Sequence, residues 1–404
     1  LDSHLALLLA VALASFFEEY DIATLTSALK HIATSLGLSE GSLPDVLGMI
    51  RLGALPAFAL IPYADRVGRR RVFLLSVLAI GVTTFATAFS RTAYEFVALQ
   101  MLTRTFFVTG SAVGFVIVAE EFPAAHRGYG IGLLGALAIT GFGFSAMLFA
   151  LVDHLPFGWR LLYVVGLIPV LLFPRLSRQV PETRRFEEHA RLREGVVPSG
   201  VFGWLDPLRE LAARRPFRAV GIALGGLLPS FGVVGTFQFT GYFTQTVHGW
   251  SPQNYAALVG VAGGAGVVGN LLSGRLADRF GRRIVGAAQL ASFPLFAALF
   301  YRGAGAVLPV AWACCVFAYQ GGRAILRAQA TELFPTHARG SASGLFAVLD
   351  VLGAAAGLFA LGRLIHGPGD LARTIPWVAA VTAFGGVVVF LFPETTNREL
   401  ETIS

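Results

Sequence analysis

Charged residues are scarce in this chain. Of its 404 residues only 14% are charged, whereas 55% are hydrophobic, and the mean hydropathy is +0.68. Soluble globular domains carry about 25% charged residues. The composition therefore excludes an ordinary soluble protein and indicates an integral membrane protein.

Cysteines and metal-ligand clusters are also scarce. Cys314 and Cys315 are adjacent within an apolar stretch, so we interpret them as small core residues rather than a redox or metal pair. There is no nucleotide-binding loop, and the glycine-rich run 259–270 lies within an apolar window, where it favours close helix packing over a dinucleotide site. We therefore expect no cofactor, no bound metal and no enzymatic activity.

Long apolar windows recur along the whole chain. Each approaches the ~20 residues that a helix needs to cross the hydrocarbon core of a bilayer. Their apolar runs are continuous, without the alternation of a membrane β-barrel. We therefore predict an all-α integral membrane protein with twelve transmembrane helices, near 5–30, 44–64, 72–90, 94–119, 129–152, 160–174, 217–245, 253–274, 284–302, 307–331, 341–364 and 374–393.

The formal net charge of +7 is unevenly distributed. With both termini placed in the cytoplasm, most arginines fall on inside loops. This is the positive-inside distribution, which sets the orientation and requires no nucleic-acid partner. The chain opens directly into its first apolar window, which predicts an uncleaved span rather than a signal peptide. The cations expected outside are Lys30, Arg91, Arg160, Arg302, Arg363 and Arg373.

Three short motifs occur twice at nearly the same spacing. The sequence ADRVGRR at 64–70 returns as ADRFGRR at 277–283, EEFPAAHRG at 120–128 returns as ELFPTHARG at 332–340, and PET at 181–183 returns at 393–395. The shifts are 213, 212 and 212 residues. A single shift shared by three motifs predicts two homologous halves of six helices each.

The repeat divides the chain into three parts. We predict an N-terminal six-helix bundle at 1–174, a cytoplasmic linker with short surface helices at 175–216, and a C-terminal six-helix bundle with a cytoplasmic tail at 217–404. The linker is rich in Arg, Glu and Pro and has no apolar run of spanning length.

The paired motifs resemble those of the major facilitator superfamily, over essentially the whole chain. The resemblance is to the branch that contains sugar porters, organic-ion transporters and metabolite:proton symporters, and the tail FPETTNRELE is most similar to the organic-ion and metabolite side. It implies two bundles that rock about a central site, opening it alternately to each side of the membrane. It also implies a monomer in the plasma membrane, here a bacterial inner membrane, whose partners are the lipid bilayer, a small-molecule substrate and protons.

Acidic and basic residues occupy matching loop positions in both halves. Charge-assisted Arg–carboxylate pairs there could tie helix ends together on the cytoplasmic face. Such a cytoplasmic gate should close only in the outward-facing state, because pairs of equal strength in both states shift no population. The alternative is that the arginines serve topology alone. The predicted gate residues are Asp65, Arg69, Arg70, Glu120, Arg127, Asp278, Arg282, Arg283, Glu332 and Arg339.

Eight charged residues fall inside apolar windows. Each costs about 2.5–3.5 kcal/mol at bilayer depth, so such residues normally face a cavity or a partner. Helical spacing places Glu18 and Asp21 on one face of the first helix and Glu19 nearly opposite Asp21. The eight residues are Glu18, Glu19, Asp21, Arg51, Arg104, Arg323, Arg327 and Asp350.

Tyr20-Asp21 is similar to the aromatic-Asp pair in the first helix of this family, where the carboxylate carries the proton and responds to an arginine in the fourth helix. By that resemblance Asp21 and Arg104 are the proton-coupling pair, with Glu18 beside them. A change in their distance would alter the proton affinity of Asp21. The alternative is a static ion pair. The sequence departs from the family at Gln100, which stands where the arginine is expected, about 6 Å along the helix from Arg104.

Polar and aromatic residues of the seventh and tenth helices are candidates for substrate binding. The Gln-Gln-x-Ser-Gly arrangement of sugar porters is absent, which disfavours a hexose. Arg51 and Asp350 could also pair between the halves, and Arg323 and Arg327, which share a helix face, could belong to the gate or to the cavity. The predicted substrate-binding residues are Gln100, Gln238, Tyr242, Gln245, Tyr319, Gln320, Arg323, Asp350 and Arg51.

These features favour a proton-coupled transporter of a small organic ion or metabolite. An uncoupled facilitator and a proton-driven efflux antiporter remain open, as does a receptor that binds without transporting. Four buried acids and four buried bases leave the charge of the substrate open as well.

Overall fold

The computed structural model describes residues 2–122, 127–182, 216–332, 339–365, 367 and 369–392, and the regular elements in these ranges are all helices. The chain separates into two compact units. Unit 1 comprises Leu1–Leu38, Met49–Val201 and Ser251–Ala256, and unit 2 comprises Ser39–Gly48, Phe202–Trp250 and Ala257–Ser404.

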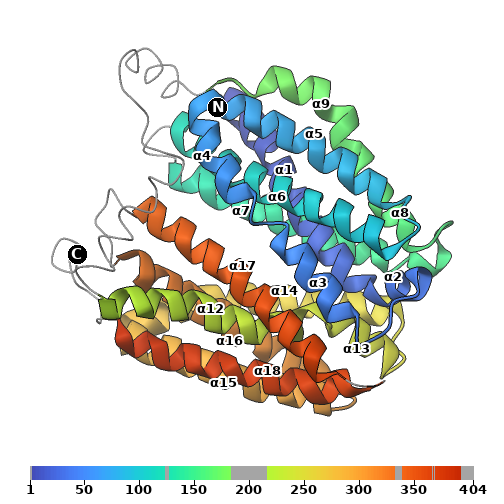
Figure 1. Ribbon diagram of the computed structural model, residues 1–404. Helices are drawn as coiled ribbons and strands as arrows, with labels where there is room; N and C mark the ends of the chain where they lie inside the picture. Colours follow the sequence, from blue (N-terminus) through green and yellow to red (C-terminus); the bar gives the residue numbers. More distant parts are fainter. Residues whose placement is uncertain are drawn as a thin grey trace. The chain divides into compact units, whose positions relative to one another are not determined.

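Unit 1 is a bundle of long helices in which α1 packs along α7 and α6, and α5 packs between α6 and α9 (Figure 1). Helix α3 (Leu43–Leu52) begins in unit 2 and ends in unit 1. The other elements of unit 1 are α1 (Asp2–Ser27), α2 (Leu29–Leu36), α4 (Ala57–Val67), α5 (Arg69–Thr87), α6 (Ala93–Glu121), α7 (Arg127–Phe149), η1 (Val152–His154), α8 (Trp159–Val164) and α9 (Leu167–Gln179).

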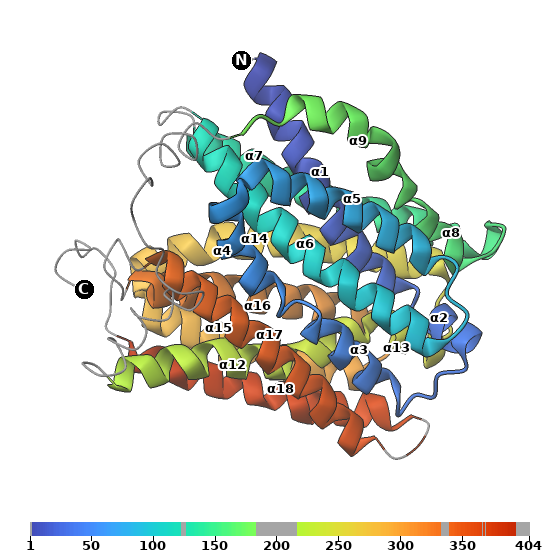
Figure 2. The ribbon, with the colours of Figure 1, turned by 45° about the horizontal axis from the view of Figure 1, so that its top comes forward.

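Unit 2 has a similar construction, in which α15 packs against α16 and α18, and α12 packs against α17 and α18 (Figure 2). Helix α14 (Pro252–Phe280) begins in unit 1 and continues in unit 2. The other elements are α12 (Pro216–Gln238), α13 (Thr240–Thr246), α15 (Arg282–Arg302), α16 (Val307–Glu332), α17 (Arg339–Leu364), α18 (Asp370–Val388) and η4 (Val389–Leu391).

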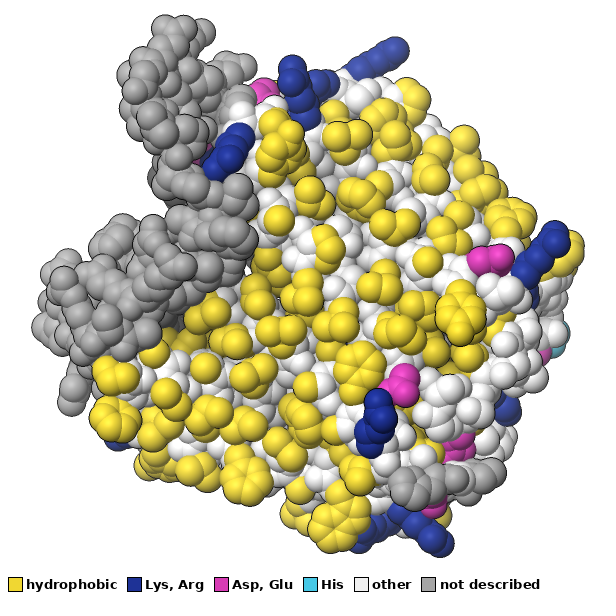
Figure 3. Space-filling view, viewed as in Figure 1, with side chains coloured by type: hydrophobic (Ala, Val, Ile, Leu, Met, Phe, Trp, Pro, Cys, Tyr) yellow, Lys and Arg dark blue, Asp and Glu magenta, His cyan; other side chains and the backbone are white. Residues whose placement is uncertain are grey.

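Nine helical stretches of the described chain are long and apolar enough to cross a bilayer. A shorter apolar stretch, Leu133–Phe149, lies in α7. Helices α1 and α16, which carry intramembrane charges, complete the predicted set of twelve. Large hydrophobic side chains cover most of the face in Figure 3, as expected for a surface that contacts acyl chains. Examples of such exposed side chains are Leu75 at 62%, Met147 at 70% and Trp377 at 72%.

Three of the predicted spans each consist of two helices joined by a short irregular stretch, and each pair together is long and apolar enough to cross a bilayer. The second span breaks between α3 and α4, where Gly53 lies so close to the backbone of Met101 that a Cβ would overlap it. The sixth breaks between α8 and α9. The seventh breaks at Phe239, which separates α12 from α13 with φ −98° and ψ 3°.

The segments predicted to lie in the cytoplasm are only partly described. Helix α9 continues to Gln179, beyond the predicted end of the first bundle at 174, and α12 begins at Pro216. Most of the predicted linker, 183–215, and the tail, 393–404, lie outside the described residues. The division into two bundles and a linker at these boundaries stays a prediction.

Each unit includes a short segment that comes from the other half of the sequence. In unit 2, the carboxylate of Glu40 accepts hydrogen bonds from the backbone N–H of Gly369 at 3.2 Å and of Leu371 at 3.1 Å, at the positive end of α18. In unit 1, Gln253 Nε2 donates to the carbonyl of Ala150 at 2.6 Å. The segments Ser39–Gly48 and Ser251–Ala256 begin 212 residues apart, which is the shift of the sequence repeat.

Glycines allow helices to approach closely at matching places in both units. A Cβ on Gly141 of α7 would overlap the carbonyl oxygen of Phe16 in α1, and a Cβ on Gly353 of α17 would overlap that of Leu227 in α12. Gly141 and Gly353 are also 212 residues apart. Small residues thus allow a close helix crossing in each unit, as is common in membrane proteins.

We expect Gly141→Ala to lower the free energy of unfolding by about 1–3 kcal/mol, because the added methyl group forces α1 and α7 apart. The matched control is Gly143→Ala in the same helix, where a Cβ has open space. Thermal unfolding of the purified variants in detergent checks the difference. Equal melting temperatures for the two variants would contradict the proposed close crossing.

Candidate functional site

Asp21 lies in the last two turns of α1 and is only 2% exposed. Its Oδ1 accepts a hydrogen bond from Gln100 Nε2 at 3.3 Å. The same Nε2 lies 3.4 Å from Thr87 Oγ1 of α5. Three helices, α1, α5 and α6, therefore supply one hydrogen-bonded group around this carboxylate.

Arg104 is also buried, at 5% exposure, one turn beyond Gln100 on α6. It interacts electrostatically with Asp21, but none of the ion pairs among the described residues involves it. The direct partner of Asp21 is thus the neutral amide of Gln100. The sequence placed Gln100 among the substrate-binding candidates, whereas the structure joins it to the predicted coupling residues.

The position of Gln100 follows from how α6 begins. Thr92 Oγ1 accepts a hydrogen bond from the N–H of Glu95 at 3.2 Å, and Glu95 Oε2 accepts one from the N–H of Thr92 at 3.3 Å. This capping box satisfies two free N–H groups at the helix start. It fixes the first turn of α6, from which Gln100 and Arg104 follow on one face at a spacing of four residues.

Glu18 shares the face of Asp21, as helical spacing predicts, and interacts electrostatically with it. Its Oε2 accepts a hydrogen bond from Ser111 of α6, and Ser111 Oγ lies 3.2 Å from Ser15 Oγ. Glu19 is half-buried and has interactions of its own. Ser111 was not predicted, because a lone serine in an apolar helix gives no signal in the sequence.

Tyr20 serves to position α1. Its hydroxyl donates to the carbonyl of Leu162 at 2.6 Å, and its ring packs among those of Phe16, Phe17 and Phe144. The neighbouring residue Asp21 is therefore held by a rigid aromatic cluster, which keeps its carboxylate directed at α6.

In unit 2 the acid within a predicted span is Asp350 of α17, which is half-buried. Ser230 of α12 donates a hydrogen bond to its Oδ1, and Arg323 Nη2 of α16 lies 3.1 Å from its Oδ2. Asp350 is thus already neutralised within unit 2. Its predicted pairing with Arg51 stays a prediction. Arg327 lies one turn beyond Arg323, with its Cζ 6.0 Å from the ring centre of Phe346.

Aromatic rings surround this ion pair. Phe237 lies 5.4 Å from Tyr319 and 5.0 Å from Trp312, measured between ring centroids. The Cζ of Arg323 is 5.7 Å from the ring of Tyr319, close enough for a cation–π contact. Phe237 was not predicted as a site residue, because in the sequence it is one of many apolar residues of α12.

The helix break at Phe239 changes the predicted arrangement of the seventh span. Gln238 ends α12, whereas Tyr242 and Gln245 lie on α13, so the three do not share one face of a continuous helix. Gln238 and Gln245 are 5% and 2% exposed. Phe243 packs against Phe300 and Tyr301, which makes it part of the helix packing. Gln320 of α16 is half-buried.

The predicted cytoplasmic gate is described in part. Arg69 pairs with Glu120, and their side chains are 17% and 11% exposed. Glu182, from the first PET motif, accepts hydrogen bonds from the N–H of Arg69 at 3.0 Å and of Arg70 at 3.1 Å, which caps α5. The side chains of Asp65, Arg127, Glu332 and Arg339 lie outside the described part of the chain.

Arg70 and its repeat counterpart Arg283 bind backbone carbonyls. Arg70 donates to the carbonyls of Ser177 and Val180 at the end of α9. Arg283 donates to the carbonyl of Phe390 at the corresponding end of the last span. These arginines complete helix C-termini, a role that the expectation of Arg–Glu pairs missed. In the same loops of unit 2, Asp278 is exposed and Arg282 is partly exposed.

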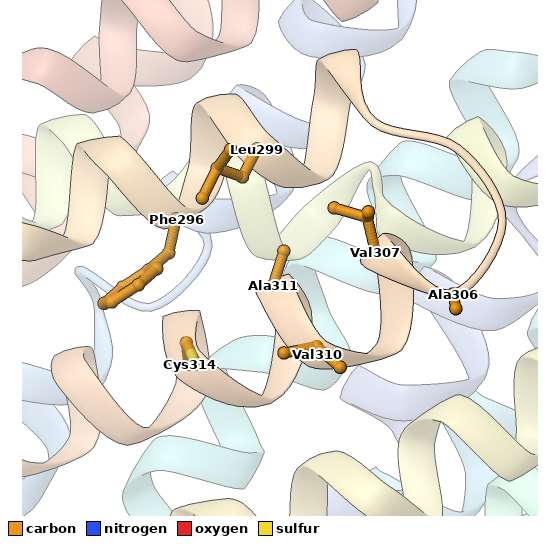
Figure 4. A pocket seen from close by; sticks show the side chains of 7 residues that line it. All are labelled: Phe296, Leu299, Ala306, Val307, Val310, Ala311 and Cys314. Carbon is orange, nitrogen blue, oxygen red and sulfur yellow. The ribbon is translucent and has the colours of Figure 1, made fainter.

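A pocket of about 310 Å³ lies between α15 and α16 (Figure 4). Its lining is apolar throughout, so it offers no group that could orient a polar or charged substrate. It shares no residue with the predicted site. The lining residues are Phe296, Leu299, Ala306, Val307, Val310, Ala311 and Cys314.

We expect the Arg69–Glu120 pair to be energetically coupled. Because both side chains are largely buried, Arg69→Ala and Glu120→Ala should each destabilise the protein, and the double variant should cost less than their sum by about 1 kcal/mol or more. Thermal unfolding in detergent measures this coupling. Arg71→Ala, at the exposed neighbouring position, is the control, and additive effects would contradict a pair that contributes to stability.

Proteins with similar sequences include three transport proteins. A gallate transporter of Pseudomonas putida is 32% identical over 180 residues, which are 42% of this chain and 38% of that protein. A cis,cis-muconate transport protein of Acinetobacter baylyi is 24% identical over 96% of this chain and 89% of its own length. The arabinose-proton symporter of Bacillus subtilis is 23% identical over 98% of this chain and 93% of its own length.

The fold has solved counterparts too. The inward-open xylose transporter of E. coli superposes with a TM-score of 0.75 at 19% identity, covering 99% of both chains. The sequence profile of the Major Facilitator Superfamily matches residues 11–358 and, in a second match, 265–402. The twelve helices in two six-helix halves are those of this fold. The chain therefore belongs to the Major Facilitator Superfamily, and it is a multi-pass membrane transporter rather than an enzyme.

Proposed function

We propose that this transporter couples the movement of a small organic anion to that of protons by alternating access, and that Asp21 carries the proton. The observation that supports this most is the buried Asp21 carboxylate, which is held by the neutral amide of Gln100 while Arg104 lies nearby without pairing. A carboxylate locked into a buried ion pair resists protonation, because losing its charge leaves the partner unpaired. Asp21 is not locked in this way.

Gln100 suits both protonation states of Asp21. Its Nε2 donates to the ionised carboxylate, and its Oε1 has no hydrogen-bond partner among the described residues. An amide can rotate to present either group, so Oε1 could accept the proton of a neutral Asp21. Arg104 then acts as the charge whose distance favours or disfavours ionisation.

The organic anion is supported by two lines of argument. The gallate and cis,cis-muconate named for the relatives are both carboxylates with conjugated carbon frameworks. In unit 2, the ring of Tyr319 lies beside the guanidinium of Arg323, and Phe237 packs against both Tyr319 and Trp312. Such a group could stack on a conjugated framework while Arg323 exchanges Asp350 for the carboxylate of the substrate.

The cellular placement follows the arginine distribution. We propose a bacterial inner membrane with both termini in the cytoplasm, and a monomer surrounded by lipid. On that placement, the Arg69–Glu120 pair and the caps made by Arg70 and Arg283 lie on the cytoplasmic side, as expected for a gate there.

An uncoupled facilitator is the second candidate. It is favoured by Gln100, which stands where the family carries the arginine, since a transporter that has lost coupling need not keep that arginine in place. A test that separates uphill from downhill transport decides between the two functions.

Asp21→Asn should abolish uphill uptake driven by a pH gradient and leave exchange of substrate across the membrane in place, because an amide cannot carry the proton. Uptake and counterflow in proteoliposomes measure both activities. Asp153→Asn, which alters an exposed carboxylate of unit 1, is the control. Uphill uptake in Asp21→Asn at the level of the unchanged protein would refute coupling through Asp21.

A thermal-shift screen identifies the class of substrate. At about pH 5.5 and about pH 7.5, conjugated carboxylates near 100 times their Kd should raise the melting temperature by a few degrees, whereas organic cations and neutral sugars should not. Arg323→Gln should remove the shift. Stabilisation by sugars or cations alone would contradict an anion substrate.

A further inference from the structure

We propose that unit 1 contains a proton path of its own, in which ordered water and side-chain hydroxyls connect Asp21 to the end of the bundle where α5 turns into α6 and α8 begins. We call it the unit 1 proton path. Its residues are Asp21, Thr84, Thr87, Ser90, Gln100, Trp159 and Tyr163. The inference rests on the proposed role of Asp21.

Polar groups extend from the carboxylate to the surface, partly through hydrogen bonds and partly through the backbone of Thr87 and Ser90. Beyond Gln100 and Thr87, Ser90 Oγ donates to the carbonyl of Thr87 at 2.8 Å. Arg160 Nη2 donates to the carbonyl of Ser90 at 2.9 Å, and Arg160 Nη1 donates to the exposed Ser35 Oγ at 2.9 Å. Polar groups therefore continue from the fully buried Asp21 to a solvent-exposed residue without leaving unit 1.

Four buried polar atoms along this series have no hydrogen-bond partner among the described residues. They are Gln100 Oε1, Thr84 Oγ1, Tyr163 OH and Trp159 Nε1, in side chains that are 1%, 0%, 0% and 4% exposed. Leaving such groups unsatisfied is costly, and buried polar groups of native proteins bind protein atoms or ordered water. Four of them in one bundle indicate a chain of bound water.

The four residues lie on α5, α6 and α8, which pack against one another in unit 1. Trp159 and Tyr163 are one turn apart on α8, with ring centroids separated by 5.8 Å. Thr84 and Thr87 are one turn apart on α5, on the same face. Phe96 of α6 packs against both rings, with its ring centroid 6.0 Å from that of Trp159 and 6.2 Å from that of Tyr163. The apolar rings keep the path narrow, while the polar atoms provide its binding points.

The residues along the path divide into relay groups and anchors. The hydroxyls of Thr84 and Tyr163 both donate and accept, so each can pass a proton on to the next water. The indole of Trp159 and the amide of Gln100 only hold water in place. One proton that enters at the surface thus becomes one proton on Asp21, and no other group gains or loses charge.

The charged groups around Asp21 fit this assignment. Asp21 interacts electrostatically with Glu18 of its own helix, with Arg104 of α6 and with Tyr163 of α8. Helix α5 presents threonines on this side, and α7 presents Ser145, which is bonded to Thr24 of α1 at 2.8 Å.

Radiolytic hydroxyl-radical footprinting of the purified protein tests for the water directly, because radicals generated from bound water label the side chains that it touches. Tyr163 should be labelled although its side chain is fully buried. Tyr301 is the matched ring, since it is 3% exposed and its hydroxyl donates to the carbonyl of Thr236. Equal absence of label on the two tyrosines would overturn the proposal.

Transport assays test the path functionally. The double variant Tyr163→Phe, Thr84→Val removes both relay hydroxyls and should slow uphill, pH-driven uptake about tenfold, while substrate exchange without a pH gradient stays within about twofold. Thr109→Val is the matched control, because Thr109 is buried on α6 and its hydroxyl is bonded to the carbonyl of Thr105. Uphill uptake by the double variant at the rate of Thr109→Val would overturn the path.

Asp21→Asn distinguishes failure of the path from failure of the proposed function. If Asp21→Asn abolishes uphill uptake while the double variant transports normally, coupling stands and the proton reaches Asp21 by another route. If Asp21→Asn retains uphill uptake, the proposed coupling fails, and the path fails with it as a route to the proton carrier.

Discussion

The cost of holding charge at membrane depth shapes the interior of both units. Asp21 and Asp350 each lie where helices cross, and each receives a hydrogen bond from another helix, Gln100 in the first case and Ser230 in the second. Neither acid could be accommodated by its own helix alone. In unit 2 the crossing of α12 and α17, which Gly353 makes close, brings Ser230 within reach of Asp350.

The two acids are satisfied in different ways, and the difference matters for function. Asp350 receives a hydrogen bond from the hydroxyl of Ser230 and pairs with the guanidinium of Arg323. Asp21 has an amide, which can pair with either protonation state, and a guanidinium that is near but not paired. On the proposed function, one half of the repeat supplies the proton carrier and the other supplies the charge that recognises the substrate.

Much of the fold could be predicted from the sequence, because the bilayer imposes helix length and apolarity on every span. The repeated loop motifs predicted the two halves, and the structure confirms the twelve helices. The interruptions could not be predicted. The break after α3 depends on how closely Gly53 approaches Met101. The assignment of Ser39–Gly48 to unit 2 depends on its hydrogen bonds to the start of α18. Both kinds of contact arise only in the folded chain.

The candidate site was predictable where it rested on formal charge. The sequence singled out Asp21, Asp350, Arg69 and Glu120, because charges stand out in apolar windows and matched loops. It could not show that Gln100, rather than Arg104, would donate the hydrogen bond to Asp21, since the partner depends on the depth at which α1 crosses α6. Neutral residues such as Phe237, Tyr163 and Ser111 have no distinguishing pattern and needed the structure.

Two short segments, Ser39–Gly48 and Ser251–Ala256, each belong to the unit formed mainly by the other half of the sequence, and this constrains how the protein folds during synthesis. Ser39–Gly48 leaves the ribosome early, yet it belongs to unit 2, whose next described helix begins only at Pro216. Unit 1 in turn waits for Ser251–Ala256. Domains usually fold one after another during synthesis, but here neither unit can be completed until translation has passed well into the second half of the chain. The two units therefore have to be finished together.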